Sequence, residues 1–270
     1  MREQPSLARL TVATLNTRGI APLGSRLSAR YAVIGAGFQA GDADVACFQE
    51  VLTYWHLRLL ARWMRPFWHV SYQPSVAGPA GGLVTFSRLP VTGTAYHGFG
   101  VPPATPGISR SERLKAGPKG ALVTWLEKPG LAVVNTHPMP NKDGDWSEAN
   151  RFHPLHRAQL TALAGVVRAA PGPIVVCGDF NIDRDSSLFT GFVRDTGLCD
   201  VFKGDCPPTF RAEYLPAGAT PHCIDFILAS EPVKAEAATL LFTEKVALPG
   251  GPGYASDHLG LSARLLLPAS

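Results

Sequence analysis

Short apolar segments that end in polar side chains are the feature that most constrains the fold of this chain. Segments with the composition and length of β-strands occur at residues 10–15, 44–50, 82–87, 121–126, 131–136, 174–177, 224–228 and 259–265. Residues 174–177 are entirely apolar, as expected for a strand that is covered on both faces. Carboxylates, amides and imidazoles stand at the ends of most of these segments. Because such groups are costly to bury without partners, we expect them to gather at one edge of the sheets.

Helical periodicity occurs at three places between these segments, in residues 27–38, 54–64 and 155–167. Strands outnumber helices, and this predicts an α/β fold in which two mostly antiparallel sheets pack face to face with helices outside, a four-layer α/β sandwich. Stretches rich in Pro and Gly are expected to be surface loops, at residues 74–82, 98–120 and 249–253. Since none of them resembles a linker, residues 1–270 are expected to form a single domain.

Composition excludes several classes of protein. Apolar residues make up 46% and charged residues 17% of the chain, which provides a large core and excludes general disorder. The net charge of +4 is too small for a dedicated nucleic-acid-binding arm. The longest apolar runs, such as residues 265–267, are far shorter than the roughly 18 residues that span a bilayer. The five cysteines form no C-x-x-C pair, and residues 1–6 show no secretory signal. We therefore expect reduced thiols and a cytoplasmic location, or a secreted one if the chain is a trimmed mature form.

Six short motifs stand at the ends of the expected strands. They are Asn16, Gln49-Glu50, Thr136-His137, Gly178-Asp179-Phe180-Asn181, Ile224-Asp225 and Ser256-Asp257-His258. Each motif alone is weak, because an aspartate in a turn or a histidine at a strand end is common. No packing rule requires all six together, so the ordered set favours a catalytic site.

The residue types of this set suit chemistry with a hard divalent cation. Oxygen ligands are available from Asn16, Glu50, Asp179, Asn181 and Asp257. The set offers neither a thiolate nor paired imidazoles for zinc, whereas Mg²⁺ takes carboxylates, waters and substrate phosphate. His137 and His258 could serve as acid and base, and Asp225 could hold the His258 ring in one tautomer.

In their order and spacing, the motifs resemble those of the endonuclease/exonuclease/phosphatase superfamily, which has the DNase I-like fold, over nearly the whole chain. The resemblance implies a Mg²⁺-dependent phosphodiester hydrolase, with Mn²⁺ as a substitute, in which water attacks the phosphorus in line. It implies that the metal is held by Glu50, Asn16 and Asp257.

The resemblance also implies roles for the remaining motif residues. Asp179 and Asn181 are expected to orient the attacking water and a phosphate oxygen. His258 with Asp225 is expected to be the general base or the pair that polarises the phosphate. His137 is expected to be the acid or a phosphate-contacting imidazole on the other side.

Within the superfamily, three segments are similar to the neutral sphingomyelinase-like branch. Residues 118–123 are similar to the segment in which Lys119 would bind the substrate phosphate, and residues 156–160 and 81–90 also match. A phospholipid head group is therefore the favoured substrate, with peripheral membrane contact left open and a monomer expected. Residues 138–146 depart from that branch, and Trp146 is expected to be an exposed loop residue. His156 is expected at a solvated helix start, and the histidines outside the motifs, His222 among them, are expected to be structural or on the surface.

Two other functions stay open. A Mg²⁺-dependent endo- or exonuclease would use the loop with Arg110, Arg113, Lys115 and Lys119, whose local charge of about +3 could meet a phosphate backbone. A non-catalytic binding module on the same fold would typically have lost a carboxylate or a histidine, and none of the six motifs is broken.

Overall fold

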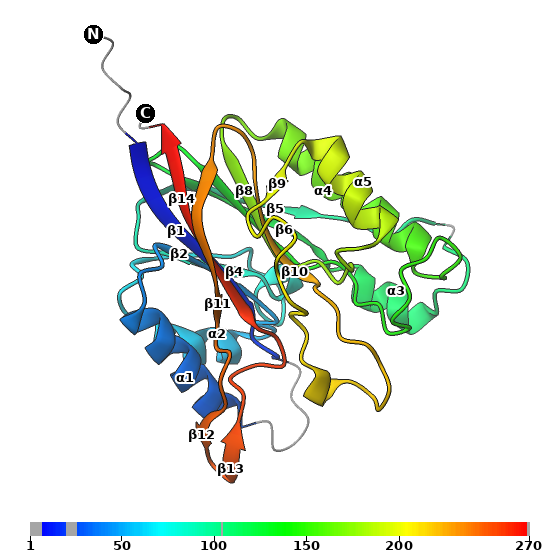
Figure 1. The fold of residues 1–270 in the computed structure, drawn as a ribbon, viewed down its shortest axis with the longest axis horizontal. Helices are drawn as coiled ribbons and strands as arrows, with labels where there is room; N and C mark the ends of the chain where they lie inside the picture. Colours follow the sequence, from blue (N-terminus) through cyan, green and yellow to red (C-terminus); the bar gives the residue numbers. More distant parts are fainter. Residues whose placement is uncertain (1–6, 20–25, 104, 269–270) are drawn as a thin grey trace.

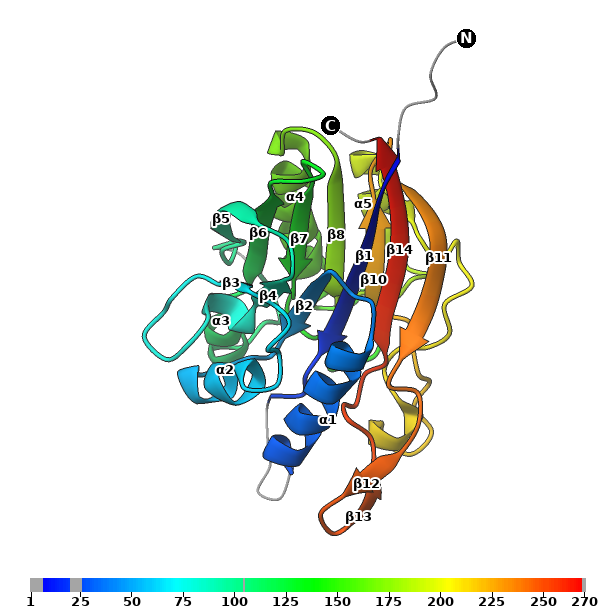
Figure 2. The same ribbon diagram turned by 90° about the vertical axis from the view of Figure 1, so that its left-hand side faces the viewer.

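Two six-stranded sheets packed face to face form the centre of the molecule, with helices on both outer sides (Figure 1 and Figure 2). The computed structural model describes residues 7–19, 26–103 and 105–268. The first sheet has the order β11 (Lys234–Leu241), β14 (Gly260–Pro268), β1 (Leu7–Asn16), β2 (Val45–Gln49), β4 (Val84–Ser87) and β3 (His69–Ser71). The second has the order β5 (Val91–Gly98), β6 (Gly120–Leu126), β7 (Ala132–Thr136), β8 (Ile174–Asp179), β10 (Asp225–Ala229) and β9 (Cys199–Asp200).

Among these strands, two neighbouring pairs are parallel, β1 with β2 and β7 with β8, and the others are antiparallel. Each parallel pair is connected through a helix, α1 (Leu27–Ala40) in the first sheet and α4 (His153–Ala169) in the second. A parallel pair needs such a crossover, and the carboxyl ends of both its strands then lie at the same edge. The expected α/β sandwich of two mostly antiparallel sheets is confirmed.

Side chains of the central strands point alternately to the two faces of each sheet, and both faces are packed against other layers. In β1, Leu10 and Val12 belong to the apolar cluster that contains the second sheet, whereas Ala13 and Leu15 pack in the cluster with α1 and α2 (Tyr54–Ala61). A strand side chain points to the opposite face at every step, so a strand that is apolar throughout can be buried on both faces. Helix α5 (Ser187–Thr196) packs beside α4 on the outer side of the second sheet.

A buried amide bridge joins the two sheets directly beneath the carboxyl ends of their central strands. Gln49 Nε2 donates to Thr14 Oγ1 at 3.0 Å and to Asn135 Oδ1 at 2.7 Å. Asn135 Nδ2 donates to the backbone carbonyls of Phe48 and Val84, both at 3.0 Å. The bridge ties β1, β2 and the start of β4 to β7. The predicted residues Asn16, Glu50 and His137 stand at or directly after the ends of β1, β2 and β7.

The three predicted helices are present with shifted ends, since α2 ends at Ala61 and α4 begins at His153. The expectation of a surface loop over 98–120 is wrong, because this stretch contains α3 (Arg110–Ala116). Ser109 Oγ accepts from Glu112 N and Glu112 Oε2 accepts from Ser109 N, a capping box that starts the helix. A helix of two turns is too short to show periodicity.

The short hairpin of β12 (Val246–Leu248) and β13 (Gly251–Gly253) occupies part of another expected loop. Strands β5 and β11 were not predicted either; both are partly exposed strands at the edges of their sheets, and neither has a continuous run of large apolar residues along its length. Within the described ranges, the helices are too short or too polar to cross a membrane. Residues 1–6, on which the expectation about a signal peptide depends, lie outside the described residues.

Replacing Asn135 with leucine is expected to lower the free energy of unfolding by about 2–4 kcal/mol, because two buried carbonyls and the Gln49 amide lose their partner. Urea unfolding followed by circular dichroism would measure the change. Thr124→Val is the matched control, since the Thr124 hydroxyl is buried without a hydrogen-bond partner. Equal destabilisation by both substitutions would contradict the role of the bridge.

Candidate active site

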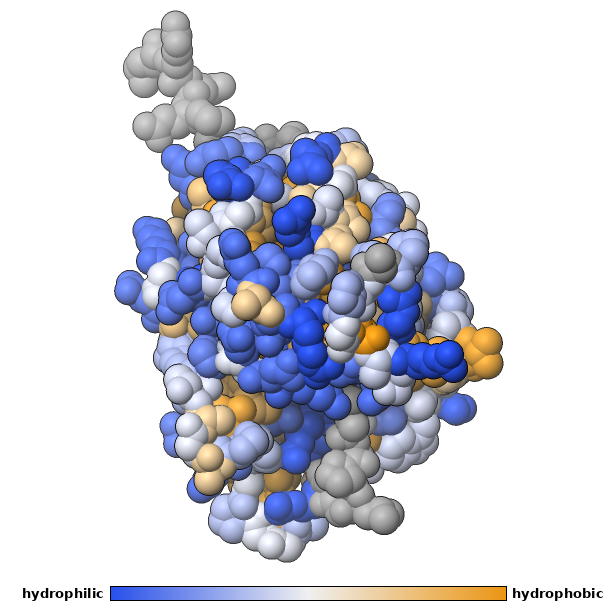
Figure 3. Space-filling view, turned by 90° about the vertical axis from the view of Figure 1, so that its right-hand side faces the viewer, coloured by the Kyte–Doolittle hydropathy of each residue, from blue (hydrophilic) through white to orange (hydrophobic). Residues whose placement is uncertain are grey.

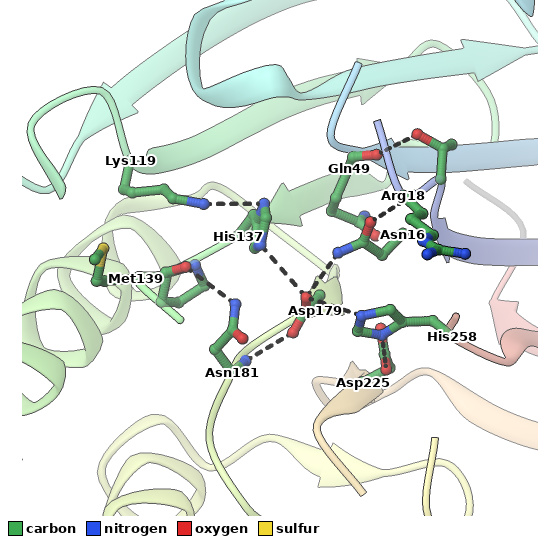
Figure 4. A network of polar contacts seen from close by, with 12 residues as sticks. Asn16, Arg18, Gln49, Lys119, His137, Met139, Asp179, Asn181, Asp225 and His258 are labelled. Atoms are coloured by element: carbon green, nitrogen blue, oxygen red, sulfur yellow. Dashed lines mark hydrogen bonds and ion pairs between the residues drawn. The ribbon is translucent and has the colours of Figure 1, made fainter. Parts of the chain in front are cut away.

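The strand ends bring the predicted residues into one cleft of about 750 Å³ (Figure 4). Its lining includes Asn16, Glu50, His137, Asp179, Asn181, Asp257 and His258. Two further predicted residues stand directly behind the lining, where Lys119 contacts His137 and Asp225 contacts His258. The structure thus places all nine predicted site residues in one contiguous group.

Asp179 lies at the centre of this group. Its Oδ2 accepts from Asn16 Nδ2 at 2.8 Å and lies 3.3 Å from His137 Nε2 and 3.7 Å from His258 Nε2. Its Oδ1 accepts from the backbone N of Asn181 at 2.9 Å. Burial by itself raises the pKa of Asp179, but the charge of His258 and the hydrogen bond from His137 outweigh it and hold the pKa well below its ordinary range. Asp179 is therefore ionised at neutral pH.

His258 and Asp225 form a buried ion pair on one side of Asp179. His258 Nδ1 donates to Asp225 Oδ2 at 2.8 Å, which leaves Nε2 facing Asp179. Burial lowers the pKa of His258, but the Asp225 and Asp179 carboxylates outweigh it and raise the pKa to about 10. The antiparallel register of β8 and β10 sets Asp225 directly opposite Asp179. In this arrangement His258 is a proton donor at neutral pH.

His137 and Lys119 form a second pair on the other side. Lys119 Nζ lies 3.1 Å from His137 Nδ1, and with the ammonium as donor the His137 hydrogen sits on Nε2, toward Asp179. Burial lowers the pKa of Lys119 to about 8, although the Glu50 and Asp179 carboxylates oppose the change. The residue predicted to bind phosphate thus also fixes the orientation of an imidazole.

Glu50 and Asp257 add two further carboxylates to the lining of the cleft. Burial raises the pKa of Asp257, and the nearby Glu50 carboxylate adds to this effect. Arg18, which the sequence did not indicate, places Nε 3.4 Å from Asp257 Oδ2 and donates its backbone N–H to Asn16 Oδ1 at 3.0 Å.

Asp179, Asp225 and His258 also offer ligand atoms within 4.8 Å of one another, close enough to share a metal ion. These three residues therefore form a group that could hold a cation, within the part of the chain that the structure describes.

Aromatic and proline side chains form another wall of the cleft. Trp146 Nε1 donates to the Asn181 carbonyl at 2.9 Å, and its ring lies 4.6 Å from the ring of His222. Phe210 and Tyr214 line the same cleft, together with Pro216. The expectation that Trp146 is an exposed loop residue is therefore wrong, because its ring is partly buried, whereas His222 packs against it and contacts Asp183 at 3.2 Å, consistent with a structural position. Both residues come from irregular loops, where no periodicity signals their direction.

His156 is buried, and the expectation of a solvated helix start is wrong. Its Nε2 lies 2.8 Å from the Met139 carbonyl, while Gln159 Oε1 accepts from Met139 N at 2.9 Å. Burial lowers the pKa of His156 to about 4, so the ring is neutral and can donate to this carbonyl. The pair fixes the segment that follows His137, whose Pro138 carbonyl accepts from Asn181 Nδ2 at 3.2 Å.

The four cationic residues weighed for a nuclease do not form one surface. Arg113 donates to the Pro102 carbonyl at 3.0 Å, and Lys119 turns toward His137. Arg110 and Lys115 remain exposed on α3.

The model of the Endonuclease/Exonuclease/phosphatase family matches residues 13–258. The chain belongs to this family. The expected superfamily is thereby confirmed, as is the expected enzyme class, a hydrolase that acts on phosphoester bonds.

Solved structures similar to this family member include proteins of two kinds. A humanized TDP2 of D. rerio is 18% identical, with 95% of this chain and 98% of that chain covered and a TM-score of 0.72. SmcL is 16% identical, with 95% and 98% covered and a TM-score of 0.73. Sphingomyelinase C of Streptomyces griseocarneus is 18% identical, with 95% and 99% covered and a TM-score of 0.68. At these identities the likeness shows the shared fold. No curated protein sequence matches the chain.

The raised pKa of His258 predicts a pH dependence of stability. Its ordinary value is 6.5 and its folded value is about 10, so the stabilisation is complete below pH 6.5 and is lost as the pH rises through 10. The difference in unfolding free energy between the wild type and His258→Gln should therefore shrink by about 2 kcal/mol or more between pH 6.5 and 10. Urea titrations in EDTA would measure it, with substitution of the exposed His97 as control. A difference that does not change with pH would argue against a charged His258.

Proposed function

We propose that this family member is a Mg²⁺-dependent phosphodiester hydrolase that uses in-line attack by water, with a phospholipid head group as the favoured substrate. The observation that carries the proposal is the ionised Asp179 between two imidazoles, in a cleft that also contains Glu50 and Asp257. We further propose that the chain acts as one domain and as a monomer.

The donor set fits a hard divalent cation. Asn16, Glu50 and Asp257 offer oxygens in one cleft, and the mutual repulsion of the two carboxylates is what a cation would relieve. We assign the metal to these three residues because His258 Nδ1 and Asp225 Oδ2 already satisfy each other at 2.8 Å. A bound divalent ion would supply charge neutralisation at the phosphate. A structure of the β toxin of Staphylococcus aureus that contains magnesium ions supports this choice of metal.

The protein groups around the phosphate would divide the work between them. Asp179, ionised and fixed by Asn16, would accept a hydrogen bond from the attacking water, and Asn181 would position the water or a phosphate oxygen. His258, positively charged through Asp225, would donate to a phosphate oxygen on which negative charge increases. His137, oriented by Lys119, would donate from Nε2 on the other side. Of the two roles expected for His258, this geometry favours polarisation of the phosphate.

The aromatic wall suits a lipid head group that carries a quaternary ammonium group. Trp146 lines the cleft, where its ring can accept a quaternary ammonium group, and Pro216 adds apolar surface. The Tyr214 ring already holds a cation, since the Arg18 guanidinium lies 4.2 Å from its centre. The structural neighbours include a sphingomyelinase C and a TDP2 complexed with single-stranded DNA product, so both substrate classes occur on this fold. The nuclease alternative lacks a continuous cationic surface in the region of α3.

Substitution of the central groups tests the chemistry. Asp179→Asn and His258→Gln should each lower kcat for bis-p-nitrophenyl phosphate by about 10²–10⁴-fold, because each removes a group that acts on the water or the phosphate. Glu50→Gln should raise the Mg²⁺ concentration for half-maximal activity by about 10–100-fold, whereas the exposed Glu148→Gln is the control. Unchanged kinetics in all three variants would support a non-catalytic binding module instead.

The substrate class is tested by a hydrolysis panel in Mg²⁺ and in EDTA. It contains sphingomyelin, phosphatidylcholine, and single- and double-stranded DNA, with His258→Gln as the inactive reference. Release of phosphocholine without cleavage of DNA is the expected result. Cleavage of DNA alone would overturn the lipid assignment in favour of the nuclease.

A further inference from the structure

The outer face built from α1 and α2 is positively charged and rich in exposed aromatic side chains. Residues 51–111 contain no aspartate or glutamate, and neither does α1. Of the acidic residues nearest in sequence, Asp42 pairs with Arg264 at 3.0 Å and Glu50 lines the cleft. The exposed side chains of α1 are uncharged, namely Ser28, Ala36, Gln39 and Ala40, with Gly37 between them.

The charged and aromatic residues share one side of α2. Trp55, Arg58 and Arg62 follow one another at spacings of three and four residues, so they project on the same side. Trp55 is 53% exposed, and Trp63, which follows Arg62, is 41% exposed. A hollow of about 620 Å³ between α1 and α2 is lined by Arg62, Trp63 and Arg65, together with Ser28, Gln39 and Leu59. We call these residues, with Trp55 and Arg58, the α1–α2 face; both helices are at the front of Figure 2.

Two exposed aliphatic side chains, Leu52 and Val76, stand near the start of α2. Tyr54 N donates to the Ala77 carbonyl at 3.2 Å and Tyr54 Oη donates to the Ser75 carbonyl at 2.8 Å, which holds the loop of Val76 against the start of α2. Leu52 and Val76 are both exposed, Val76 completely. Leu52 stands two residues after Glu50, which lines the cleft.

We propose that the α1–α2 face docks onto a bilayer that contains anionic phospholipid. Tryptophan side chains favour the membrane–water interface, and arginines near an anionic leaflet are attracted to its phosphates. The lack of acidic side chains on both helices removes the repulsion that would oppose this contact. Leu52 and Val76 favour lipid over nucleic acid as the partner, because aliphatic side chains neither stack on bases nor pair with phosphates. The inference deepens the proposed function, on whose lipid substrate it rests.

The opposite side of the molecule has a different character. Figure 3 shows that the side turned to the right in Figure 1, where α4 and α5 lie, is mainly hydrophilic. Arg157 and Arg168 are exposed on α4, within a groove that also contains Glu148 and Asp195. These two arginines provide a control with the same change of charge.

Sedimentation with vesicles tests the proposal. The wild type should bind vesicles of phosphatidylcholine and phosphatidylglycerol at 7:3 in 0.1 M salt, and bind less as the salt concentration rises. The double variant Arg58→Glu/Arg62→Glu should bind at least tenfold more weakly, while Arg157→Glu/Arg168→Glu should bind within about threefold of the wild type. Both double variants should hydrolyse soluble bis-p-nitrophenyl phosphate as the wild type does. Since three of the five tryptophans stand at residues 55–68, binding should also shift tryptophan emission to shorter wavelength.

Several outcomes would overturn the proposal. They are a wild type that does not bind anionic vesicles, equal weakening in both double variants, and an α1–α2 variant that loses binding to single-stranded DNA but keeps binding to vesicles. Because the soluble ester reports catalysis without a membrane, failure of vesicle binding with intact turnover would reject the docking face and leave the hydrolase standing. A wild type that does not hydrolyse the soluble ester would instead reject the proposed function.

Discussion

The amide bridge from Gln49 to Asn135 is the contact on which the arrangement of the rest depends. Two sheets held only by apolar contact could slide relative to each other, because such contact is not directional. The bridge removes that freedom, since Asn135 satisfies the Phe48 and Val84 carbonyls of the facing sheet while it accepts from Gln49. Asn135 precedes His137 by two residues and Gln49 precedes Glu50 by one. The same buried polar contact that sets the sheets in register therefore also sets the two halves of the cleft.

Buried charge in the cleft is balanced by geometry. Asp179 and Asp225 lie opposite each other on neighbouring strands, and two buried carboxylates would repel without a cation near them. His258 pairs with Asp225 and faces Asp179, while His137 approaches Asp179 from the other side. This balance keeps Asp179 ionised and His258 charged, which are the states that the proposed hydrolysis needs. Glu50 and Asp257 line the same cleft, and Arg18 Nε lies 3.4 Å from Asp257 Oδ2.

The surfaces around the cleft suggest how one fold serves different phosphoesters. The candidate site residues stand at strand ends, whereas the aromatic wall comes from the loops that hold Trp146, Phe210 and Tyr214. Loops can change without disturbing the sheets, so substrate preference is separable from chemistry. The α1–α2 face adds a third element, because it would present the cleft to a lipid surface rather than to a molecule in solution.

The sequence by itself determined the sandwich, the family and the nine candidate site residues. The apolar pattern of a strand is visible in a few consecutive residues. The motifs stand at strand ends, and the sheet topology brings these ends together. Only the tertiary structure revealed that the rings of Trp146 and His222 pack edge to face, that His156 is buried against Met139, and that Arg18 approaches Asp257. These contacts join loops or helix ends distant in the chain, and such contacts leave no periodic trace. The short helix α3 was not predicted for a related reason, because a helix of two turns has too few residues to show hydrophobic periodicity. The positive charge of His258 likewise depends on the tertiary structure, because the carboxylates that raise its pKa, those of Asp225 and Asp179, come from strands β10 and β8.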